Sequence, residues 1–357
     1  MRILAIETSC DETAMALVNA TGGLSSPKFK IEENVVSSQI AIHRPFGGVV
    51  PNLAKREHIK NLPIVLSEIF GDTRENIIAK DFKKVDMISV TVGPGLEPAL
   101  WTGIEFAKEL HKEAKKKNKK LLLRGVNHME GHLYSFLLQQ KTVTQKSKPK
   151  IKNMFPSVAL VVSGGHTILL LLESLTKWKK LGETRDDAVG EAFDKVARML
   201  DLPYPGGPEV EKLAKDGNSA AIDFPKPMIH AKNYDFSFSG LKTAVLYYLK
   251  KNKNLGNNGF ADIAASFQKS AIDVLVKKTI KAAGEFGAKS VILCGGVAGN
   301  QALREVLGDE CKKEKLEFFV PPFEYNTDNA SMIAAAAYIN FLRKKTYSVK
   351  ARAGLGM

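Results

Sequence analysis

Residues 157–172, SVALVVSGGHTILLLL, contain two apolar runs separated by a short polar turn with two adjacent glycines. Apolar runs of this length that are bounded by turn residues are typical of buried β-strands. A Gly-Gly pair permits a tight hairpin turn, and it also lets backbone N–H groups approach a phosphate without obstruction by a Cβ atom. The stretch therefore predicts a β-hairpin, and its turn is either purely structural or a phosphate site.

The beginning of the chain has the same layout. Residues 3–18, ILAIETSCDETAMALV, again read as strand, polar turn and strand, with Ser9, Asp11 and Glu12 in the turn. Strands alternate with helical patterns beyond the hairpins, which indicates an α/β architecture. We therefore predict an internal duplication of the fold. Two such lobes with opposed hairpin turns form a cleft, where nucleotides commonly bind.

A lysine-rich stretch separates the two halves. Residues 141–152 hold five lysines and few apolar side chains, which is typical of a linker or a surface excursion. We assign residues 1–140 to an N-terminal lobe, residues 141–155 to a linker and residues 156–357 to a C-terminal lobe.

Composition limits the class of protein. A chain of 357 residues with 44% hydrophobic side chains can bury the cores of two lobes. The three cysteines, Cys10, Cys294 and Cys311, are too widely spaced for a disulfide framework, so a reducing compartment is expected. No uncharged apolar run of about 20 residues is present, and residues 1–6 read directly as a strand, so we expect a cytoplasmic protein without a membrane span.

The chain is basic. Its 52 Lys and Arg residues exceed its 38 Asp and Glu residues, for a formal charge of +14. Such a charge suits a polyanionic partner such as a nucleic acid, although a general lysine bias would produce the same value.

A histidine pair is the first candidate for chemistry. His128 and His132 lie four positions apart in NHMEGH (127–132), a spacing that places both imidazoles on one face of a helix. They are either metal ligands or polar residues at a helix start. Asp328, just before a small-residue helix at 332–342, is either the N-cap of that helix or a third ligand. Two imidazoles and one carboxylate leave coordination positions open, as catalytic iron and zinc sites require.

Further turns suggest a nucleotide site. Asp194 lies on a predicted helix (188–200) that precedes the glycine turn 204–208, and it either holds a ribose hydroxyl or pairs with a neighbouring cation. Strand 290–294 leads through a Gly-Gly turn to a helix that begins at about Asn300, a combination that supports adenine and phosphate binding. In FSFSGLKT (236–243), Ser239 or Lys242 faces an anion at a helix start, or Ser239 merely caps that helix.

Together the motifs resemble the TsaD family, the bacterial tRNA N6-adenosine threonylcarbamoyltransferases, over nearly the whole chain. The matching segments, in order, are IETSCDET (6–13), GGVVP (47–51), GPGL (93–96), NHMEGH (127–132), VSGGHT (162–167), GEAFDK (190–195), YPGG (204–207), FSGLK (238–242) and CGGVAGN (294–300). Residues 97–101, EPALW, replace small residues of the family, and the insert at 141–153 is longer than usual.

The resemblance implies the actin, Hsp70 and sugar-kinase (ASKHA) fold, two RNase H-like lobes around a nucleotide cleft. It implies transfer of a threonylcarbamoyl group from threonylcarbamoyl-AMP to N6 of the adenosine 3′ of the anticodon, in tRNAs that read codons beginning with A. The implied partners are tRNA, a paralogous inactive subunit of similar fold (TsaB-like) and a small P-loop ATPase (TsaE-like).

The resemblance also assigns residues. His128, His132 and Asp328 would bind one divalent metal ion, Fe²⁺ in the first place and Zn²⁺ as the alternative. Ser9, Asp11 and Glu12 are candidates for a general base near the cleft. The residues that would hold threonylcarbamoyl-AMP, or ATP or ADP in its place, are Val162, Ser163, Gly164, Gly165, His166, Asp194, Gly207, Glu211 and Asn300.

Two other functions compete with this one. A zinc peptidase of the H-E-x-x-H type needs Glu directly after the first histidine, where this chain has Met129, and Glu130 should point away from the metal. A sugar kinase or a non-catalytic ATP-binding module would share the fold, but neither requires the two histidines.

Overall fold

The computed structural model describes residues 1–138, 151–252 and 256–357. The chain forms two compact units. Unit 1 consists of Met1–Lys152 together with Pro321–Met357, and unit 2 consists of Asn153–Val320. Residues 139–150 lie outside the described residues, and they include most of the predicted linker 141–155.

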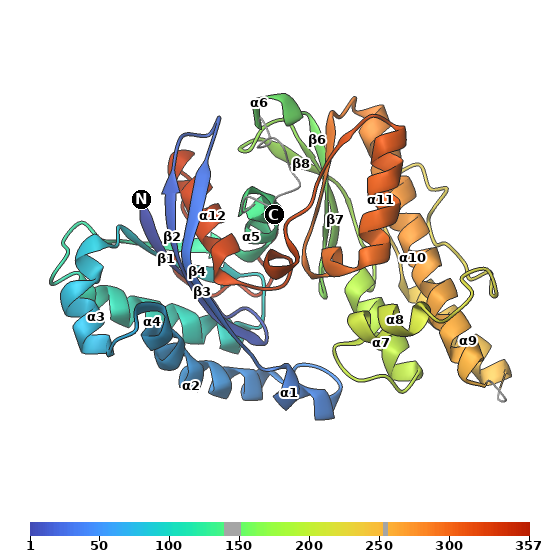
Figure 1. Ribbon diagram of the computed structural model, residues 1–357, viewed down its shortest axis with the longest axis horizontal. Helices are drawn as coiled ribbons and strands as arrows, with labels where there is room; N and C mark the ends of the chain where they lie inside the picture. Colours follow the sequence, from blue (N-terminus) through green and yellow to red (C-terminus); the bar gives the residue numbers. More distant parts are fainter. Residues whose placement is uncertain (139–150, 253–255) are drawn as a thin grey trace. The chain divides into compact units, whose positions relative to one another are not determined.

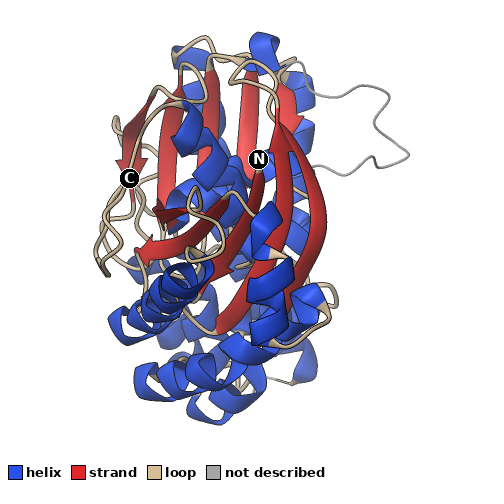
Figure 2. Ribbon diagram, turned by 90° about the vertical axis from the view of Figure 1, so that its left-hand side faces the viewer, coloured by secondary structure: helices blue, strands red, loops and turns tan. Residues whose placement is uncertain are grey.

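Unit 1 contains a five-stranded mixed sheet in the order β3-β2-β1-β4-β5. The first three strands are antiparallel neighbours, and β4 and β5 run parallel to β1. Figure 2, with strands in red and helices in blue, shows the long strands of this unit curving alongside the helices that cover them. The strands are β1 (Arg2–Glu7), β2 (Glu12–Thr21), β3 (Lys28–Ser38), β4 (Met87–Gly93) and β5 (Leu122–Asn127).

Helices cover both faces of this sheet (Figure 1). α2 and α4 pack against each other and the sheet, while α12 packs against β1 and β2 and against α5. The helices of unit 1 are α1 (Ile40–His43), α2 (Pro51–Phe70), α3 (Arg74–Lys80), α4 (Glu97–Ala114), α5 (His128–Tyr134) and α12 (Ala330–Leu342). Short 3₁₀ turns lie at Arg44–Phe46, Phe82–Lys84, Ser135–Leu138 and Phe323–Tyr325.

The position of α12 corrects the predicted domain limits. We assigned residues 156–357 to the second lobe, but Pro321–Met357 returns to unit 1. The residues of α12 from Ala330 to Asn340 are all buried, and most are small or apolar. A helix that is apolar all round must be covered on all sides, and the sheet and helix α5 of unit 1 provide that cover.

Unit 2 repeats the same topology. Its sheet has the order β10-β9-β6-β7-β8, in which β6, β7 and β8 form an antiparallel meander and β9 and β10 run parallel to β6. This is the order of unit 1 with β6 in the place of β1, so the predicted duplication of an α/β fold is confirmed. The strands are β6 (Ser157–Val162), β7 (Thr167–Leu172), β8 (Trp178–Glu183), β9 (Ser290–Cys294) and β10 (Glu317–Phe319).

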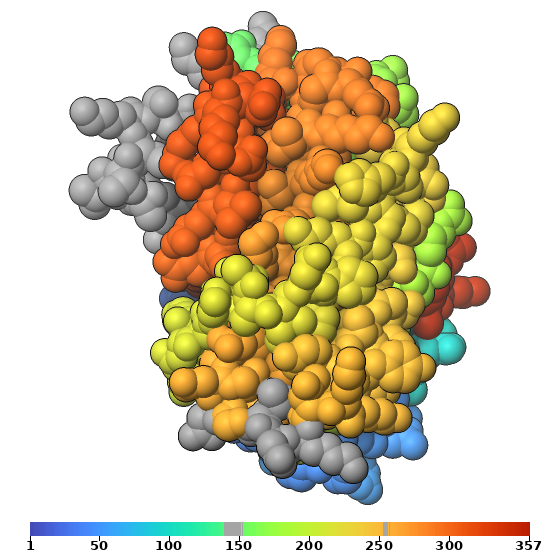
Figure 3. All heavy atoms as spheres, turned by 90° about the vertical axis from the view of Figure 1, so that its right-hand side faces the viewer, coloured from blue at the N-terminus to red at the C-terminus, as the bar shows by residue number. Residues whose placement is uncertain are grey.

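The helices of unit 2 carry much of its core. α10 packs on β6 and β9 and contacts α8, α9 and α11. Figure 3 shows the helical side of this unit, coloured yellow to orange, with α10 and α11 at its surface. The helices are α7 (Val189–Met199), α8 (Gly206–Ala214), α9 (Ser239–Lys251), α10 (Asn257–Glu285) and α11 (Gln301–Lys313), with α6 (Ile151–Met154) at the boundary and a 3₁₀ turn at Gly296–Gly299.

None of the helices in the described part of the chain combines the length and the apolar character that crossing a bilayer would require.

Candidate functional site

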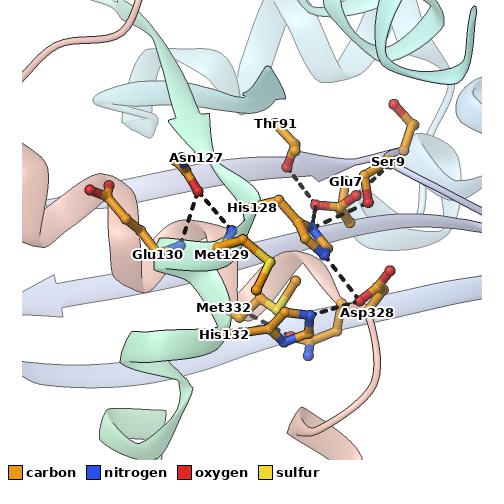
Figure 4. Close-up of polar contacts among 12 residues, drawn as sticks. Glu7, Ser9, Thr91, Asn127, His128, Met129, Glu130, His132, Asp328 and Met332 are labelled. Atoms are coloured by element: carbon orange, nitrogen blue, oxygen red, sulfur yellow. Dashed lines mark hydrogen bonds and ion pairs between the residues drawn. The ribbon is translucent and has the colours of Figure 1, made fainter. Parts of the chain in front are cut away.

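The helix α5 presents two histidines from its first turns. Asn127, the last residue of β5, caps the helix because its Oδ1 accepts hydrogen bonds from the backbone N–H groups of Met129 (2.8 Å) and Glu130 (3.2 Å). The helix therefore begins at His128, and His132 follows one turn later. The two imidazole rings lie 4.7 Å apart between centroids (Figure 4).

Asp328 completes the group. Its Oδ1 lies 3.1 Å from His132 Nε2 and 3.5 Å from His128 Nε2. The N-cap of α12 is Asn329, whose side chain accepts the backbone N–H of Met332, so the capping interpretation of Asp328 is wrong. All three residues belong to unit 1. The histidine and aspartate side chains therefore meet within one unit, whereas the predicted domain limits place the histidines in the N-terminal lobe and Asp328 in the C-terminal lobe.

The donor set fits a divalent cation. One ligand atom from each of His128, His132 and Asp328 can be chosen so that all lie within 4.8 Å of one another. His132 is fully buried, and neither of its ring nitrogens makes a hydrogen bond among the described residues, although Nε2 lies 3.1 Å from Oδ1 of Asp328. Buried polar atoms are normally satisfied, and a cation held by one ring nitrogen and the carboxylate would satisfy that nitrogen. Two imidazole nitrogens and one carboxylate oxygen suit Fe²⁺ or Zn²⁺.

Glu7 is a site residue that the sequence analysis missed. It ends β1, is fully buried, and places Oε2 3.2 Å from Nδ1 of His128. The same carboxylate accepts hydrogen bonds from the Ser9 backbone N–H and the Thr91 hydroxyl. A carboxylate on the outer nitrogen of a histidine keeps Nε2 available for a metal. The sequence signal was a lone acid directly after the apolar residues 3–6 of a buried strand.

Charge interactions reflect this packing. Burial alone would lower the pKa of His128, but the carboxylates of Asp328 and Glu7 outweigh it and raise the pKa to about 9. Burial likewise acts to raise the pKa of Glu7, but the neighbouring His128 leaves it below its usual range. The two carboxylates therefore stabilise the protonated form of His128.

The three general-base candidates lie beside this group, with Ser9 and Asp11 in the turn after β1 and Glu12 at the start of β2. Ser9 is buried, and its hydroxyl lies 3.2 Å from Nδ1 of His128. Asp11 is also buried, and its backbone carbonyl accepts the N–H of Gln39. Burial, followed by the charges of Asp11 and Asp328, raises the pKa of Glu12 well above its ordinary value. Glu12 therefore binds a proton more tightly than an exposed glutamate does.

Glu130 lies on the other side of α5, as predicted. Figure 4 shows its side chain directed away from the two histidines. Its carboxylate is fully buried and contacts Arg343 and Lys345 as ion pairs. It cannot activate a water at the histidine pair, and Met129 occupies the position after His128. The geometry therefore argues against a zinc peptidase.

The nine predicted nucleotide-binding residues all lie in unit 2. Five of them form the end of β6 and the turn to β7, which is closed by a 2.8 Å hydrogen bond from Ser163 N–H to the His166 carbonyl. Val162 is buried, whereas Gly164 and Gly165 are exposed. A Cβ atom at either glycine would meet nothing within 4 Å, so the fold itself does not require glycine there.

The other four lie on neighbouring helices. Asp194 of α7 accepts the backbone N–H of Gly206 (2.8 Å) at the start of α8, beside Gly207. Glu211 of α8 accepts the N–H of Gln301 (2.7 Å) at the start of α11, which Asn300 caps. Because a carboxylate already lies at each of these helix starts, they suit hydroxyl or amine groups better than phosphates.

Close backbone contacts link these helices to the β6–β7 turn. A Cβ atom at Gly190, in the first turn of α7, would lie 2.8 Å from the Cα of Gly164. Gly295, after β9, has a φ of 96° and approaches Val162 so closely that a Cβ atom would lie 2.2 Å from its carbonyl oxygen. The nine residues thus surround the carboxyl ends of the parallel strands β6 and β9, where α/β sheets commonly bind ligands.

One predicted anion site is filled by the chain itself. The carboxylate of Asp186 accepts the hydroxyls of Ser237 and Ser239 and the backbone N–H groups of Phe238 and Ser239. Lys242 forms an ion pair with Asp187. This stretch therefore secures the start of α9, and Ser239 is not its N-cap.

Comparison with known proteins identifies related sequences. Residues 30–335 match the family model described as TsaD, tRNA N6-adenosine threonylcarbamoyltransferase. A protein of that name from Moorella thermoacetica is 47% identical over 343 residues, covering 96% of this chain and 92% of the relative. The same name applies to a Clostridium botulinum protein that is 46% identical over 351 residues, covering 98% and 95%.

Solved structures share the fold at low sequence identity. HypF from T. kodakarensis has a TM-score of 0.56 at 14% identity, covering 96% of this chain and 47% of that chain. The activator of 2-hydroxyisocaproyl-CoA dehydratase from Clostridium difficile, solved with bound ADPNP, has a TM-score of 0.50 at 13% identity and covers 96% of both chains. These likenesses support the ASKHA fold.

Proposed function

We propose a specific reaction for this chain, which belongs to the family of tRNA N6-adenosine threonylcarbamoyltransferases and is a tRNA-modifying transferase. The threonylcarbamoyl group passes from threonylcarbamoyl-AMP to N6 of the adenosine 3′ of the anticodon, in tRNAs that read codons beginning with A. The observation that carries this proposal is the family match over residues 30–335, a range that includes His128, His132 and Asp328.

The chemistry requires an activated donor. The lone pair of the N6 amine is delocalised into the adenine ring, so this amine is a poor nucleophile. In the proposed step N6 bonds to the carbamoyl carbon, the bond from that carbon to the phosphate oxygen breaks, and AMP leaves. The N6 nitrogen loses one proton. The protein must therefore position the two reactants, stabilise negative charge on the donor and accept a proton.

His128, His132 and Asp328 are proposed to hold one divalent ion, Fe²⁺ in the first place and Zn²⁺ as the alternative. When bound, the ion would act as a Lewis acid and polarise an oxygen of the donor. The buried Nε2 of His132 supports this assignment, since it faces the Asp328 carboxylate at 3.1 Å and makes no hydrogen bond. Glu7 supports it further, since its carboxylate lies on Nδ1 of His128 and leaves Nε2 directed at Asp328.

Residues of unit 2 are proposed to hold the adenylate. Backbone N–H groups of the exposed Gly164–Gly165 turn would bind its phosphate. The carboxylates of Asp194 and Glu211, at two helix starts, would accept ribose hydroxyls. The remaining contacts are assigned to Val162, Ser163, His166, Gly207 and Asn300. ATP or ADP would occupy the same residues.

Ser9, Asp11 and Glu12 remain the candidates for the proton acceptor. The pKa of Glu12 is raised by its burial, and a general base works best when its pKa is close to the working pH.

The acceptor tRNA follows from the family, and the formal charge of +14 suits it. We further propose a cytoplasmic location and two protein partners, a paralogous inactive subunit (TsaB-like) and a small P-loop ATPase (TsaE-like).

The direct test is a transfer assay. The protein is incubated with threonylcarbamoyl-AMP and an unmodified tRNA that reads a codon beginning with A, and the nucleosides are analysed by mass spectrometry. We expect N6-threonylcarbamoyladenosine, and none with a matched tRNA that carries guanosine in place of the target adenosine. Absence of product, even with both proposed partners added, would overturn the reaction. ATP hydrolysis without transfer would instead favour a nucleotide-hydrolysing protein of the same fold.

A further inference from the structure

We propose that the segment after α12, residues 343–356, positions the metal-binding helix α5 through Asn127 and Glu130. The inference rests on the proposed metal site and adds two positioning residues to it, neither of which is a ligand. α5 spans only His128–Tyr134. Isolated helices shorter than about 12 residues are marginal in water, so contacts with the rest of unit 1 must decide where its histidines lie.

The first connection is made by Glu130. Its Oε1 lies 2.6 Å from the Arg343 guanidinium, 2.8 Å from the Lys345 ammonium and 2.9 Å from the Tyr347 hydroxyl. Its Oε2 accepts a 2.8 Å hydrogen bond from Asn340, near the end of α12. One fully buried carboxylate thus binds four donors that lie within eight residues of one another. The face of α5 opposite its histidines is thereby tied to this part of the chain.

The second connection is at the start of α5. While Oδ1 of Asn127 caps the helix, its Nδ2 donates a 3.0 Å hydrogen bond to the carbonyl of Gly356. Two residues earlier, Gly125 forms a β-bridge with Tyr347, and a Cβ atom there would lie 3.1 Å from the Tyr347 carbonyl oxygen. The segment therefore contacts β5 and the helix cap at separate points.

A third connection reaches the other side of the histidine group. The segment bonds to the end of β4 and to the loop after it, since Arg352 N–H donates to the Val92 carbonyl (2.8 Å) and Gly95 N–H donates to the Ala353 carbonyl (3.2 Å). In the same loop, Leu96 N–H donates to the carbonyl of Ser9 (2.8 Å), and Ser9 contacts His128. The segment therefore supports both α5 and the turn that packs on His128.

Metal affinity depends on how well the ligands are held before the ion binds. If residues 343–356 set the position of α5, weakening their contacts should change the affinity and the geometry of the metal site. If the segment contributes only to folding, the same changes should lower stability and leave the metal site as it was.

The test uses Co²⁺ as the probe, with the full-length protein. Asn127→Asp keeps the capping oxygen and removes the amide donor to Gly356. Glu130→Gln keeps the size of the side chain and removes its charge. For both variants we expect Co²⁺ affinity to fall by about tenfold or more, with a changed visible absorption spectrum of the bound ion, because outer contacts typically contribute about 10- to 100-fold to metal affinity.

Milder variants and matched controls guard against simple loss of folding. Tyr347→Phe removes only the hydroxyl on Glu130 and should shift affinity in the same direction by less. Tyr338→Phe removes a hydroxyl hydrogen bond to the Gly22 carbonyl in the same unit, and Glu32→Gln removes an ion pair with Arg2. Both controls should bind Co²⁺ as the wild type does.

Each outcome decides the inference. Weaker Co²⁺ binding and an altered spectrum in the Asn127 and Glu130 variants, with unchanged controls, would support it. Wild-type affinity and spectrum in those variants, at whatever stability, would overturn it while leaving the proposed transferase intact. A wild-type protein that does not bind Co²⁺ at all would overturn both this inference and the proposed metal site.

Discussion

The turn after β1 and the turn after β6 occupy the same place in two sheets of the same topology, but their surroundings differ. In unit 1 the turn is covered, with Ser9 and Asp11 almost fully buried. In unit 2 the turn is open, and Gly164 and Gly165 are exposed. The duplicated fold thus provides two equivalent positions, and the side chains around them decide which kind of ligand each position suits.

The cover in unit 1 is polar and charged. Glu7 and Ser9 contact His128, and the loop at Gly95 lies directly on Ser9. Such a turn can orient metal ligands, whereas the open glycine turn of unit 2 offers backbone N–H groups. Three predictions test this division, and a fourth tests the contacts of Glu130 on α5, in order of decreasing effect.

Removing a proposed metal ligand should have the largest effect. For His132→Ala we expect loss of bound metal and a fall in the transfer rate of more than about 100-fold, because a ligand contributes more than the outer contacts do. Metal content per chain and single-turnover transfer would measure this. ATP binding should persist, because its proposed residues lie in unit 2. His230→Ala, at an exposed histidine of unit 2, is the control. Equal metal content in His132→Ala would contradict the assignment.

Removing the outer carboxylate should have the next largest effect. For Glu7→Gln we expect metal affinity to fall by about 10- to 100-fold, because the amide holds His128 less firmly than the carboxylate does. Competition with a chelator of known affinity would measure the change. Glu32→Gln makes the same chemical change at a surface ion pair and should leave the affinity unaltered. An unchanged affinity in Glu7→Gln would mean that His128 is oriented without Glu7.

Matched glycine variants should separate the covered turn from the open one. A Cβ atom at Gly95 would lie 2.6 Å from the carbonyl oxygen of Ser9, so Gly95→Ala should destabilise the protein by about 1–3 kcal/mol. Gly164→Ala should change stability by less than about 0.5 kcal/mol, because nothing lies near the added methyl group. It should weaken adenylate binding instead. Urea unfolding and calorimetric titration measure the two effects, and equal destabilisation by both variants would contradict the division.

The smallest expected effect is the loss of stability at acidic pH through protonation of Glu130. Burial acts to raise the pKa of Glu130, but Arg343 and the hydrogen bonds from Lys345 and Asn340 hold it below the ordinary value of 4.5. A group whose pKa is lower in the folded state stabilises the protein above its unfolded pKa, and this stability is lost as pH falls through the folded pKa. As the pH is lowered from about 5 to about 3, the urea concentration at the midpoint of unfolding should therefore fall more steeply for the wild type than for Glu130→Gln. Parallel curves would mean that Glu130 does not titrate differently on folding.

Much of the fold was predictable because it depends on local pattern. Both hairpins, the α/β class and the duplication follow from apolar runs and turn residues, and the helix predicted at 188–200 was observed as Val189–Met199. The helical spacing of His128 and His132 was also readable. Glu7 was not recognised as a site residue, because its role depends on contacts with Thr91 and His128, which are distant in sequence.

The assignment of residues 321–357 to the C-terminal lobe was wrong, because it followed the order of the chain alone. Residues 321–357 follow unit 2 in sequence, but α12 is apolar on all sides and is buried against the sheet and α5 of unit 1. That placement brings Asp328 to the histidines and Arg343 to Glu130.

Local regularities in the residues were therefore enough to establish the elements, the repeated fold and the two histidines on one helix face, because periodicity and turn chemistry act over a few neighbouring positions. The tertiary structure decided which carboxylate meets those histidines, which acid packs behind them and which segment holds their helix. Those pairings join residues up to 229 positions apart. Burying α12 against unit 1 removes its apolar surface from water, and this brings Asp328 and residues 343–356 to α5.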